Sequence, residues 1–360
     1  MEVHHNGHAA SSTAVRDTET ALYTALWHAC AGPFVTVPRA GELVFYFPQG
    51  HIEQVEASEN QAVGQQRPIY NIPWKILCRV INVQLKVDPG TDEVFAQVTL
   101  FPQSNQDENT VEYEPPPPPP RFHVRSFSKK LTASDTSTYG GLSVLKRHAE
   151  ECLPPLDMSS EPVMRELIAK DLHGNDWRFQ HIFRGQPKRH LLTSGWSGFV
   201  SSKRLVPGDT FVFLRDDNGG IGVGVRRGMI EQSNDPIHLN GVATAWEAIS
   251  SGSTLFTVHH RPRSSPRAEF MIPFDQYIES AATNYSIGMN FEMRSERDTV
   301  EHRFTGTIMR IEDIDPLRWR ESKWRCLEVR WDENCGMPLP HRVSPWSIKP
   351  IATPMQVDTV

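Results

Sequence analysis

Six consecutive prolines, Pro115–Pro120, constrain the fold of this 360-residue chain more than any other segment. Proline fixes its own φ angle and has no amide proton, so the run adopts an extended polyproline conformation and cannot continue a helix or a central strand. It therefore divides the chain into folded parts. The run is either a recognition motif for a proline-binding partner or a stiff spacer between folded units, and we favour the spacer because such sequences are semi-rigid.

The charge of the chain is unevenly distributed. Its formal net charge is -6, yet residues 121–230 hold 17 Lys and Arg against 11 Asp and Glu. Within that region, Trp177–Gly208 carries six Lys or Arg residues and no acidic residue. A basic region inside an acidic protein is typical of a segment that contacts phosphate, although a solvated basic loop gives the same pattern.

Composition narrows the class of protein. The length allows two or three domains. No apolar run approaches the roughly 18 residues of a membrane helix, and the polar residues 1–17 do not form a secretory signal. We expect a soluble intracellular protein without a membrane partner. The cysteines form no Cys-x-x-Cys pair, which predicts reduced thiols and neither a metal site nor a cofactor; they are Cys30, Cys78, Cys152, Cys326 and Cys335.

Short runs of β-branched and aromatic residues predict strands along much of the chain. Residues 1–17 are expected to be a disordered tail, with a helix following at 21–30. Beyond the prolines, regularly spaced strands and two short helices predict a small closed or nearly closed β-barrel. The expected strands are 177–179, 181–183, 189–193, 210–215 and 221–226, and the expected helices are 142–152 and 161–171. A small all-β unit of about five strands is expected at the end.

The basic loop that begins at Arg184 and ends at Arg189 joins two of these strands. Its glycine and Pro187 predict a tight, stiff turn. Arginine can donate two hydrogen bonds to a guanine edge in the major groove, so this loop is suited to base readout. The hydroxyl of Ser194 can bind a phosphate oxygen. A second candidate surface, at 129–141, has hydroxyl residues and paired glycines that allow close approach of a ligand to the backbone.

Catalytic motifs are missing from the sequence. We find no Gly-x-Ser-x-Gly, no His-Glu-x-x-His and no glycine-rich nucleotide loop of either common type. A metal-dependent nuclease would need clustered carboxylates, which the basic region lacks. We therefore expect a binding protein and not an enzyme.

Several long motifs resemble the DNA-binding region of the auxin response factors, a family of plant B3-type transcription factors. The resemblance extends over nearly all of residues 20–352. It is carried by Leu26–Pro33, Phe45–His51, Leu131–Val144, Asp171–His173, His181–His190, Val206–Asp209 and Arg342–Trp346.

The resemblance implies a mainly β fold with helices (α+β). A seven-stranded B3-type pseudobarrel at 121–228 would be inserted in a dimerisation domain. That domain would be formed by residues 18–120 and 229–282, and a small Tudor-like β-barrel would follow at 283–360.

Site residues are also implied by the resemblance. The positions that match the family's reading of TGTC-containing auxin response elements are Arg184, Pro187 and Arg189. Lys129 and Ser194 would face the DNA backbone, and Gly140 would contact bases. Tyr139 stands where many family members have histidine, which affects preference outside the core tetranucleotide. These implied residues are the seven positions Lys129, Tyr139, Gly140, Arg184, Pro187, Arg189 and Ser194.

The function implied is that of a nuclear, sequence-specific transcription factor that binds inverted repeats of double-stranded DNA as a homodimer in auxin-activated signalling. A small-residue helix would pack on its twin, although a helix buried within one chain is the alternative from the residues alone. The implied interface residues are Gly241, Val242, Thr244, Ala245 and Ala248. Other family members and auxin/indole-acetic-acid repressors would bind through regions that this chain, ending at Val360, does not contain, so we expect a fragment.

Two rival functions stay open at this point. One is a B3-type factor outside auxin signalling. The other is a chromatin reader that acts through the Tudor-like domain, where Trp324, Trp331 and Trp346 would either form a methyl-lysine cage or pack in the core.

Overall fold

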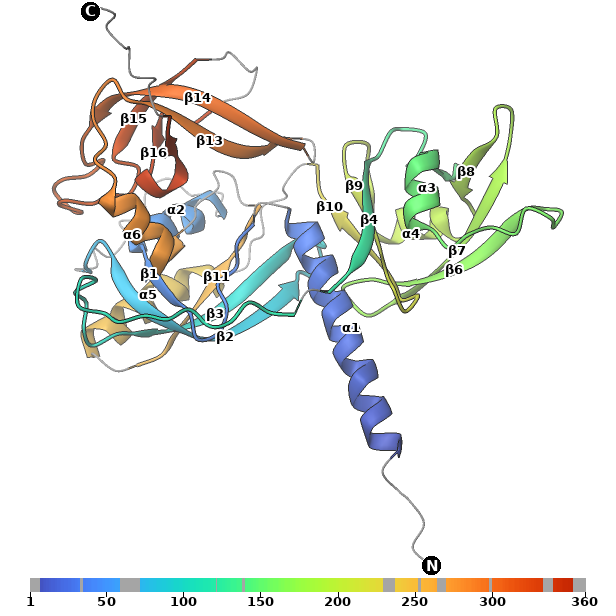
Figure 1. Ribbon diagram of the computed structural model, residues 1–360, viewed down its shortest axis with the longest axis horizontal. Coiled ribbons are helices and arrows are strands. Elements are labelled where there is room, and N and C mark those ends of the chain that lie inside the picture. The colour runs from blue at the N-terminus through green and yellow to red at the C-terminus, as the bar shows by residue number, and fades with distance from the viewer. Residues whose placement is uncertain are drawn as a thin grey trace, which may run out of the picture. The chain divides into compact units, whose positions relative to one another are not determined.

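The computed structural model describes most of the chain, and Figure 1 shows its elements. The described residues are 7–32, 35–58, 72–120, 122–137, 140–228, 237–251, 254–263, 270–297, 300–332 and 339–351. The chain forms two compact units, and the first comprises residues 1–35, 85–95 and 118–231. The second comprises residues 36–84, 96–117 and 232–360.

The proline run lies where the chain passes from the second unit to the first, between Pro117 and Pro118. Within the second unit, the guanidinium of Arg39 donates hydrogen bonds to the carbonyl oxygens of Pro116 and Pro117, at 3.1 and 2.9 Å. The run thus occupies the boundary that the spacer interpretation requires.

The first unit contains the seven-stranded sheet that was predicted, with two short helices, α3 (Lys146–Cys152) and α4 (Trp196–Ser202). Its strands pair antiparallel except for the parallel contact of β10 with β6. In spatial order they are β4 (Val124–Lys130), β9 (Thr210–Asp216), β10 (Ile221–Arg226), β6 (Met164–Lys170), β7 (Asp176–Arg184), β8 (Arg189–Leu192) and β5 (Leu142–Val144). The mainly β fold with a pseudobarrel is therefore confirmed.

Two helix predictions in this unit were wrong in whole or part. Residues 161–171 do not form a helix, because 164–170 is strand β6 with buried Leu167 and Ala169 alternating with exposed neighbours. Pairing with β7 along its whole length outweighs the helix propensity of Glu, Leu and Ala. The predicted helix 142–152 is strand β5 followed by α3, because β5 pairs with β8.

An aromatic core fills the barrel. Its largest members are all at most 1% exposed: Phe179, Trp196, Phe199, Phe211 and Phe213. Phe199 packs edge-on against Phe179 and Phe211, with ring centroids 5.6 and 5.8 Å apart. Burial of such rings is the principal stabilising contribution to a small barrel.

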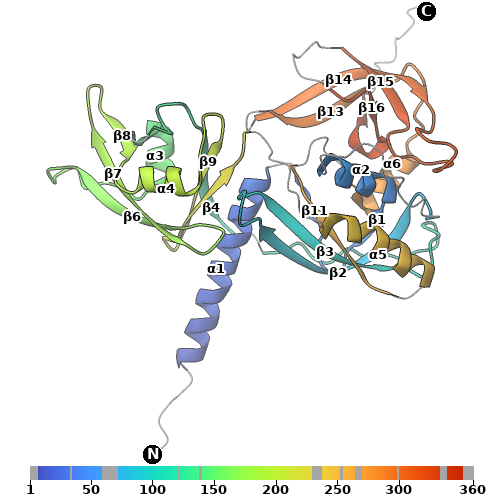
Figure 2. The same cartoon turned by 180° about the vertical axis from the view of Figure 1, so that it is seen from behind.

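Helix α1 (Gly7–Ala31) covers the outer face of β10, as both views show (Figures 1 and 2). Leu26 and Cys30 lie over Gly222 and Gly224, and a β-carbon at Gly224 would collide with the Cys30 sulfur. Both faces of β10 are thereby buried, which explains why all six of its residues are buried.

The start of α1 differs from the expected disordered tail at 1–17, because the helix begins at Gly7. Once a helix is nucleated, each further residue adds one hydrogen bond, and the alanines in 7–17 propagate it well.

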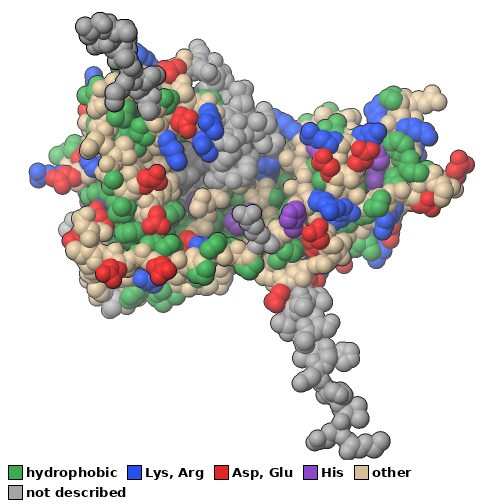
Figure 3. Space-filling view, viewed as in Figure 1, with side chains coloured by type: hydrophobic (Ala, Val, Ile, Leu, Met, Phe, Trp, Pro, Cys, Tyr) green, Lys and Arg blue, Asp and Glu red, His purple; other side chains and the backbone are tan. Residues whose placement is uncertain are grey.

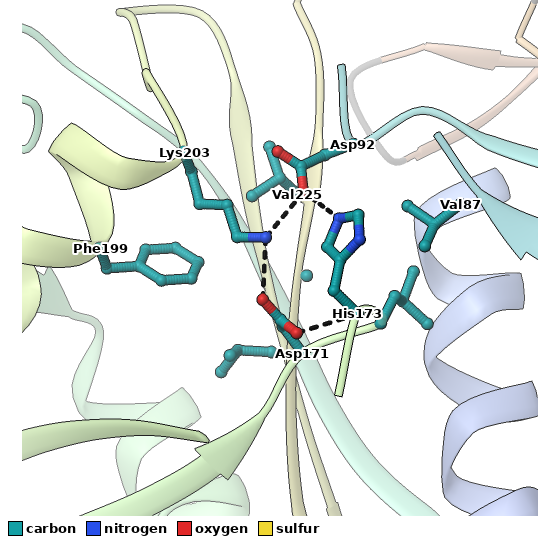
Figure 4. Close-up of a pocket in the computed structure, with 10 residues that line it drawn as sticks. Val87, Asp92, Asp171, His173, Phe199, Lys203 and Val225 are labelled. Atoms are coloured by element: carbon teal, nitrogen blue, oxygen red, sulfur yellow. Dashed lines mark hydrogen bonds and ion pairs between the residues drawn. The ribbon is translucent and has the colours of Figure 1, made fainter. Parts of the chain in front are cut away.

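A buried ion cluster links four segments of the first unit, and Figure 4 shows its members Asp92, Asp171, His173 and Lys203. The Lys203 ammonium lies 2.8 Å from carboxylate oxygens of both Asp92 and Asp171. Asp92 also accepts from the His173 imidazole at 2.8 Å and from Arg227 at 3.0 Å. Asp92 belongs to the tip of the β2–β3 hairpin, formed by β2 (Ile76–Val87) and β3 (Val94–Pro102). The cluster therefore fastens that tip to the barrel.

The second unit begins with a five-stranded antiparallel sheet. Its order is β11 (Phe256–His260), β3, β2, β1 (Leu43–Tyr46) and β12 (Met271–Pro273). Helix α2 (Pro48–Ser58) follows β1, and α5 (Ile237–Ser251) lies across this sheet (Figure 2). Helix α6 (Phe274–Ala282) continues from β12.

A second five-stranded sheet ends this unit, as predicted for the final all-β part. Its order is β16 (Arg342–Val343), β15 (Leu327–Trp331), β14 (Val300–Ile311), β13 (Asn290–Arg297) and β17 (Lys349–Pro350). A short 3-10 helix, η1 (Pro345–Ser347), precedes β17. Among the described residues, no helix is long and apolar enough to cross a membrane.

We predict that Lys203→Met will weaken the barrel by about 3 kcal/mol, because it leaves the buried Asp171 carboxylate and the partly buried Asp92 carboxylate without their shared cation. The measurement is native-state hydrogen exchange of the β9 and β10 amides. Lys146→Met is the matched control. Lys146 makes an exposed 3.7 Å pair with Glu150, so its loss should cost less than about 0.5 kcal/mol. Equal effects of the two changes would contradict a stabilising role of the cluster.

Candidate nucleic-acid interface

The β7–β8 hairpin presents the two predicted base-reading arginines as a direct cross-strand pair. Arg184 ends β7, Arg189 begins β8, and their Cα atoms are register partners. Gly185 has a φ angle of 100°, which a residue with a side chain adopts only with strain, so glycine permits this turn. Pro187 lies in the turn, and all residues from 184 to 189 are exposed.

The charges on this hairpin tip are not compensated. Like charges directly opposite each other on neighbouring strands are destabilising, yet no ion pair joins Arg184, Lys188 or Arg189 to a carboxylate in the described part of the chain. Arg125 and Arg178 of the same sheet, in contrast, pair with Asp217 and Glu166. Lys and Arg side chains gather around this hairpin in the space-filling view (Figure 3). The tip is thus suited to an anionic or acceptor-rich ligand.

Two histidines lie on the opposite face of the hairpin from these arginines. His181 Nε2 is 3.0 Å from His190 Nδ1, and the His190 ring packs on Phe183 with centroids 4.6 Å apart. Burial, and then the neighbouring His190, lower the pKa of His181 to about 4. Burial also lowers the pKa of His190. Both imidazoles are therefore neutral near pH 7, and the positive charge of the tip comes from Lys and Arg alone.

The second predicted surface is a turn organised by Asp135. The Asp135 carboxylate accepts hydrogen bonds from the Thr132 amide at 2.9 Å and the Thr132 hydroxyl at 2.7 Å. Its carbonyl oxygen accepts from the Trp196 indole at 2.7 Å. A β-carbon at Gly140 would collide with the Ser134 carbonyl oxygen, so the turn itself requires this glycine. Tyr139, predicted to act beside Gly140, lies outside the described residues.

Lys129 is placed differently from the expectation that it faces the DNA backbone. Its ammonium lies 2.7 Å from Asp135 Oδ1 and donates to the carbonyl and hydroxyl oxygens of Ser143 at 2.7 and 2.9 Å. An ammonium has three donors, so these contacts use all of them. Lys129 shares a face of β4 with buried Phe127, and its side chain is only 22% exposed.

Ser194 is exposed, and its hydroxyl donates to the Gln180 side chain at 3.3 Å. Gln180 and Arg184 lie on one face of β7 because they are separated by an even number of residues. Ser194 and the arginine pair therefore share a face, about 13 Å apart along the strand at roughly 3.3 Å per residue. That separation is close to the roughly 12 Å width of the major groove.

The predicted site left out Asp135, the residue that organises the second surface. The signal was present: Thr132 followed three residues later by Asp135 is a pattern in which hydroxyl and carboxylate bind nearby backbone amides. It also missed the histidine pair, because residues 181 and 190 come together only through the hairpin register.

Two family models match the chain. The B3 DNA binding domain matches residues 127–229, and the auxin response factor ancillary domain matches residues 270–352. Auxin response factor 2A of Solanum lycopersicum is 64% identical over 362 residues, which covers 98% of this chain and 43% of that protein. Auxin response factor 2 of Arabidopsis thaliana is 63% identical over 352 residues, covering 95% and 41%. The chain belongs to the auxin response factor family.

This member spans less than half the length of these two relatives. The B3 model begins within β4 and ends just after β10, so it covers the seven-stranded sheet. The ancillary model begins before β12 and ends after β17. Among solved structures, an Arabidopsis FUS3–DNA complex aligns with 29% of this chain and 98% of its own, at 23% identity and a TM-score of 0.26.

The helix that the family resemblance assigns to dimerisation is α5, and the structure describes the surroundings of three of its five predicted interface residues. Ala245 and Ala248 are 0% and 1% exposed, because α5 packs with this face on β11 and α2 of its own chain. Burial within one chain is the alternative that the residues alone left open, and the five interface positions stay a prediction. Thr244 is exposed on α5. Gly241 and Val242 lie in α5, where the structure describes the backbone alone.

The tryptophans of the ancillary domain do not form an open cage. Trp324 and Trp346 are 3% and 6% exposed, and Phe47 packs on Trp346 with ring centroids 4.5 Å apart. Trp331 packs edge-on against Phe291 at 5.2 Å. A methyl-lysine cage needs accessible ring faces, so the burial of Trp324 and Trp346 favours core packing for these two residues.

We predict that Arg189→Gln will raise the free energy of unfolding of the DNA-free protein by about 0.5 kcal/mol at low salt, because it relieves the cross-strand repulsion with Arg184. The gain should disappear in 1 M salt, where the screening length is about 3 Å. Urea unfolding at both salt concentrations measures it. Arg125→Gln, which removes an exposed 3.7 Å pair with Asp217, should not stabilise. Destabilisation by Arg189→Gln would show that the arginine has a structural role.

Proposed function

We propose that this chain is the DNA-binding region of a nuclear plant transcription factor in auxin signalling. It binds TGTC-containing auxin response elements and acts as a homodimer on inverted repeats. It works by binding and not by catalysis. The exposed cross-strand pair of Arg184 and Arg189, without carboxylate partners, is the observation that carries this proposal.

The chemistry of the hairpin supports base readout over simple phosphate attraction. Each guanidinium presents a planar donor fork that matches the O6 and N7 acceptors of guanine. A four-residue strand and a glycine turn hold both forks on one rigid tip. A rigid scaffold lowers the entropy lost on binding. Ser194, on the same face, is suited to a phosphate oxygen and would fix the register of the barrel on the duplex.

The second surface contributes backbone groups and not charge. Gly140 has no side chain and ends the turn that Asp135 organises, so its backbone can approach a base closely. Lys129 is not part of this proposed contact, because its donors are used inside the barrel.

Membership of the auxin response factor family favours this role over a B3-type factor outside auxin signalling. The ancillary model and the relatives with similarity on both sides of the barrel extend the likeness beyond the B3 domain itself. Partners such as other family members and auxin/indole-acetic-acid repressors would require parts of the longer proteins.

We predict that Arg184→Ala and Arg189→Ala will each weaken binding to a TGTC duplex by about 1–3 kcal/mol and reduce discrimination against a scrambled duplex. Fluorescence anisotropy at two salt concentrations measures both quantities. Arg125→Ala is the control, since Arg125 is a paired arginine of the same barrel. It should leave the ratio of specific to nonspecific affinity unchanged. If the hairpin variants lower affinity for both duplexes equally, the arginines contact phosphate and do not read bases.

The dimer is tested separately, with inverted TGTC repeats at several half-site spacings. A two-fold dimer binds best at spacings that match its geometry. Thr244→Arg places a charge on the exposed side of α5 and should abolish the spacing preference while single-site binding persists. Ala245→Leu is a contrasting change, because it overfills a buried position and should destabilise the unit itself by about 1–3 kcal/mol. Flat affinity of the wild-type chain across spacings would contradict the dimer.

A further inference from the structure

The seam of the barrel lies between its two edge strands, β4 and β5, which stand at opposite ends of the seven-stranded order. Lys129 of β4 crosses this seam. Its ammonium donates to the backbone carbonyl and the hydroxyl of Ser143 on β5, at 2.7 and 2.9 Å. A side chain therefore joins two strands that the described main-chain pairing leaves apart.

Asp135 holds Lys129 in that position. Its side chain is 3% exposed, and its Oδ1 atom lies 2.7 Å from the Lys129 ammonium. The other oxygen, Oδ2, accepts both hydrogen bonds from Thr132, so both carboxylate oxygens are used. Burial alone would raise the pKa of Asp135, but hydrogen bonds from Lys129 and Thr132 outweigh it and lower the pKa. The carboxylate is thus charged at neutral pH.

The Lys129–Asp135 pair lies where it can affect recognition of DNA. The turn that Asp135 fixes leads directly to Gly140, and the Trp196 indole ties the Asp135 carbonyl to the core. A lysine released beside this turn would be free to contact any phosphate, whatever the base sequence. The pair therefore fixes the shape of the turn and keeps a positive charge near it from attracting DNA of any sequence.

We propose that Asp135 is a specificity-determining positioning residue: it shapes the turn leading to Gly140 and holds Lys129 across the barrel seam, away from phosphate. This inference rests on the proposed DNA-binding function. In this role an acidic residue improves discrimination between TGTC and other DNA sequences, because it confines a cation. Removal of an acidic residue would ordinarily strengthen attraction to DNA of any sequence.

The test measures affinity for a TGTC inverted repeat and for a scrambled duplex of equal length, with the whole chain, over a series of salt concentrations. Asp135→Asn should lower affinity for the TGTC duplex about tenfold, which corresponds to one misplaced base contact. It should raise affinity for the scrambled duplex about twofold to fivefold. Its salt dependence should steepen by about 0.9, the increment for one new phosphate contact.

Asp157→Asn is the matched control for net charge. Asp157 also organises a turn of the barrel unit, by accepting from the Ser159 amide and hydroxyl at 2.9 and 2.6 Å. Removing its charge should leave the ratio of specific to scrambled affinity unchanged. An unchanged ratio in folded Asp135→Asn as well would overturn the proposal.

Lys129→Met provides a second, independent measurement. It tests whether Lys129 is held away from phosphate even if Asp135→Asn does not fold. Because Lys129 makes no phosphate contact in this proposal, its removal should leave the salt dependence of scrambled-duplex binding unchanged. A slope that falls by about 0.9 would show that Lys129 binds phosphate, and would refute the inference. In Lys129→Met/Asp135→Asn the steepening seen with Asp135→Asn alone should vanish.

Failure of the proposed function has a different signature. A wild-type chain that binds TGTC and scrambled duplexes equally refutes sequence-specific recognition. The salt dependence of Lys129→Met on scrambled DNA still reports whether Lys129 is confined.

Discussion

The buried contact of Lys203 with Asp92 and Asp171 is the interaction on which the barrel unit depends. Burial raises the pKa of Asp171, but hydrogen bonds from Lys203, Trp177 and Asn175 more than offset this and lower it. A buried cation between two carboxylates is tolerated only with such complete pairing, since desolvation of each ion costs several kcal/mol. The contact joins α4, the β6–β7 turn and the β2–β3 hairpin tip, so the barrel is completed by residues far earlier in the chain.

This arrangement explains why α1 and the hairpin tip belong to the barrel unit. Trp27 donates its indole hydrogen to the Lys86 carbonyl at 2.8 Å, and Tyr23 donates to the Leu85 carbonyl at 3.0 Å. The helix and the hairpin tip therefore hold each other, while Gly224 lets the helix approach β10. The expected domain 121–228 would have left the outer face of β10 uncovered.

The local sequence pattern was sufficient to predict an element when the element and its pairing partner are close in sequence. The β7–β8 hairpin was predictable because glycine and proline mark the turn between two apolar runs. Strand β6 was not, since Met164–Lys170 suits a helix as well as a strand and only its neighbour β7 decides. The Lys203–Asp92 contact spans 111 residues, which no local pattern can reveal. The family resemblance alone assigned Lys129 to the DNA backbone, and its contacts with Asp135 and Ser143 could not be read from a local pattern.

Two sets of cations in the barrel unit differ in their partners, and the difference follows from their surroundings. Lys129, Lys203 and Arg227 lie where solvent is scarce, and each has a carboxylate within 3.1 Å. Arg184 and Arg189 lie at a hairpin tip where water screens their repulsion. A paired guanidinium would have to lose its carboxylate before it could meet a base edge, whereas these two need lose only water. The same sheet thus uses compensated charge to hold its shape and uncompensated charge where a ligand can approach.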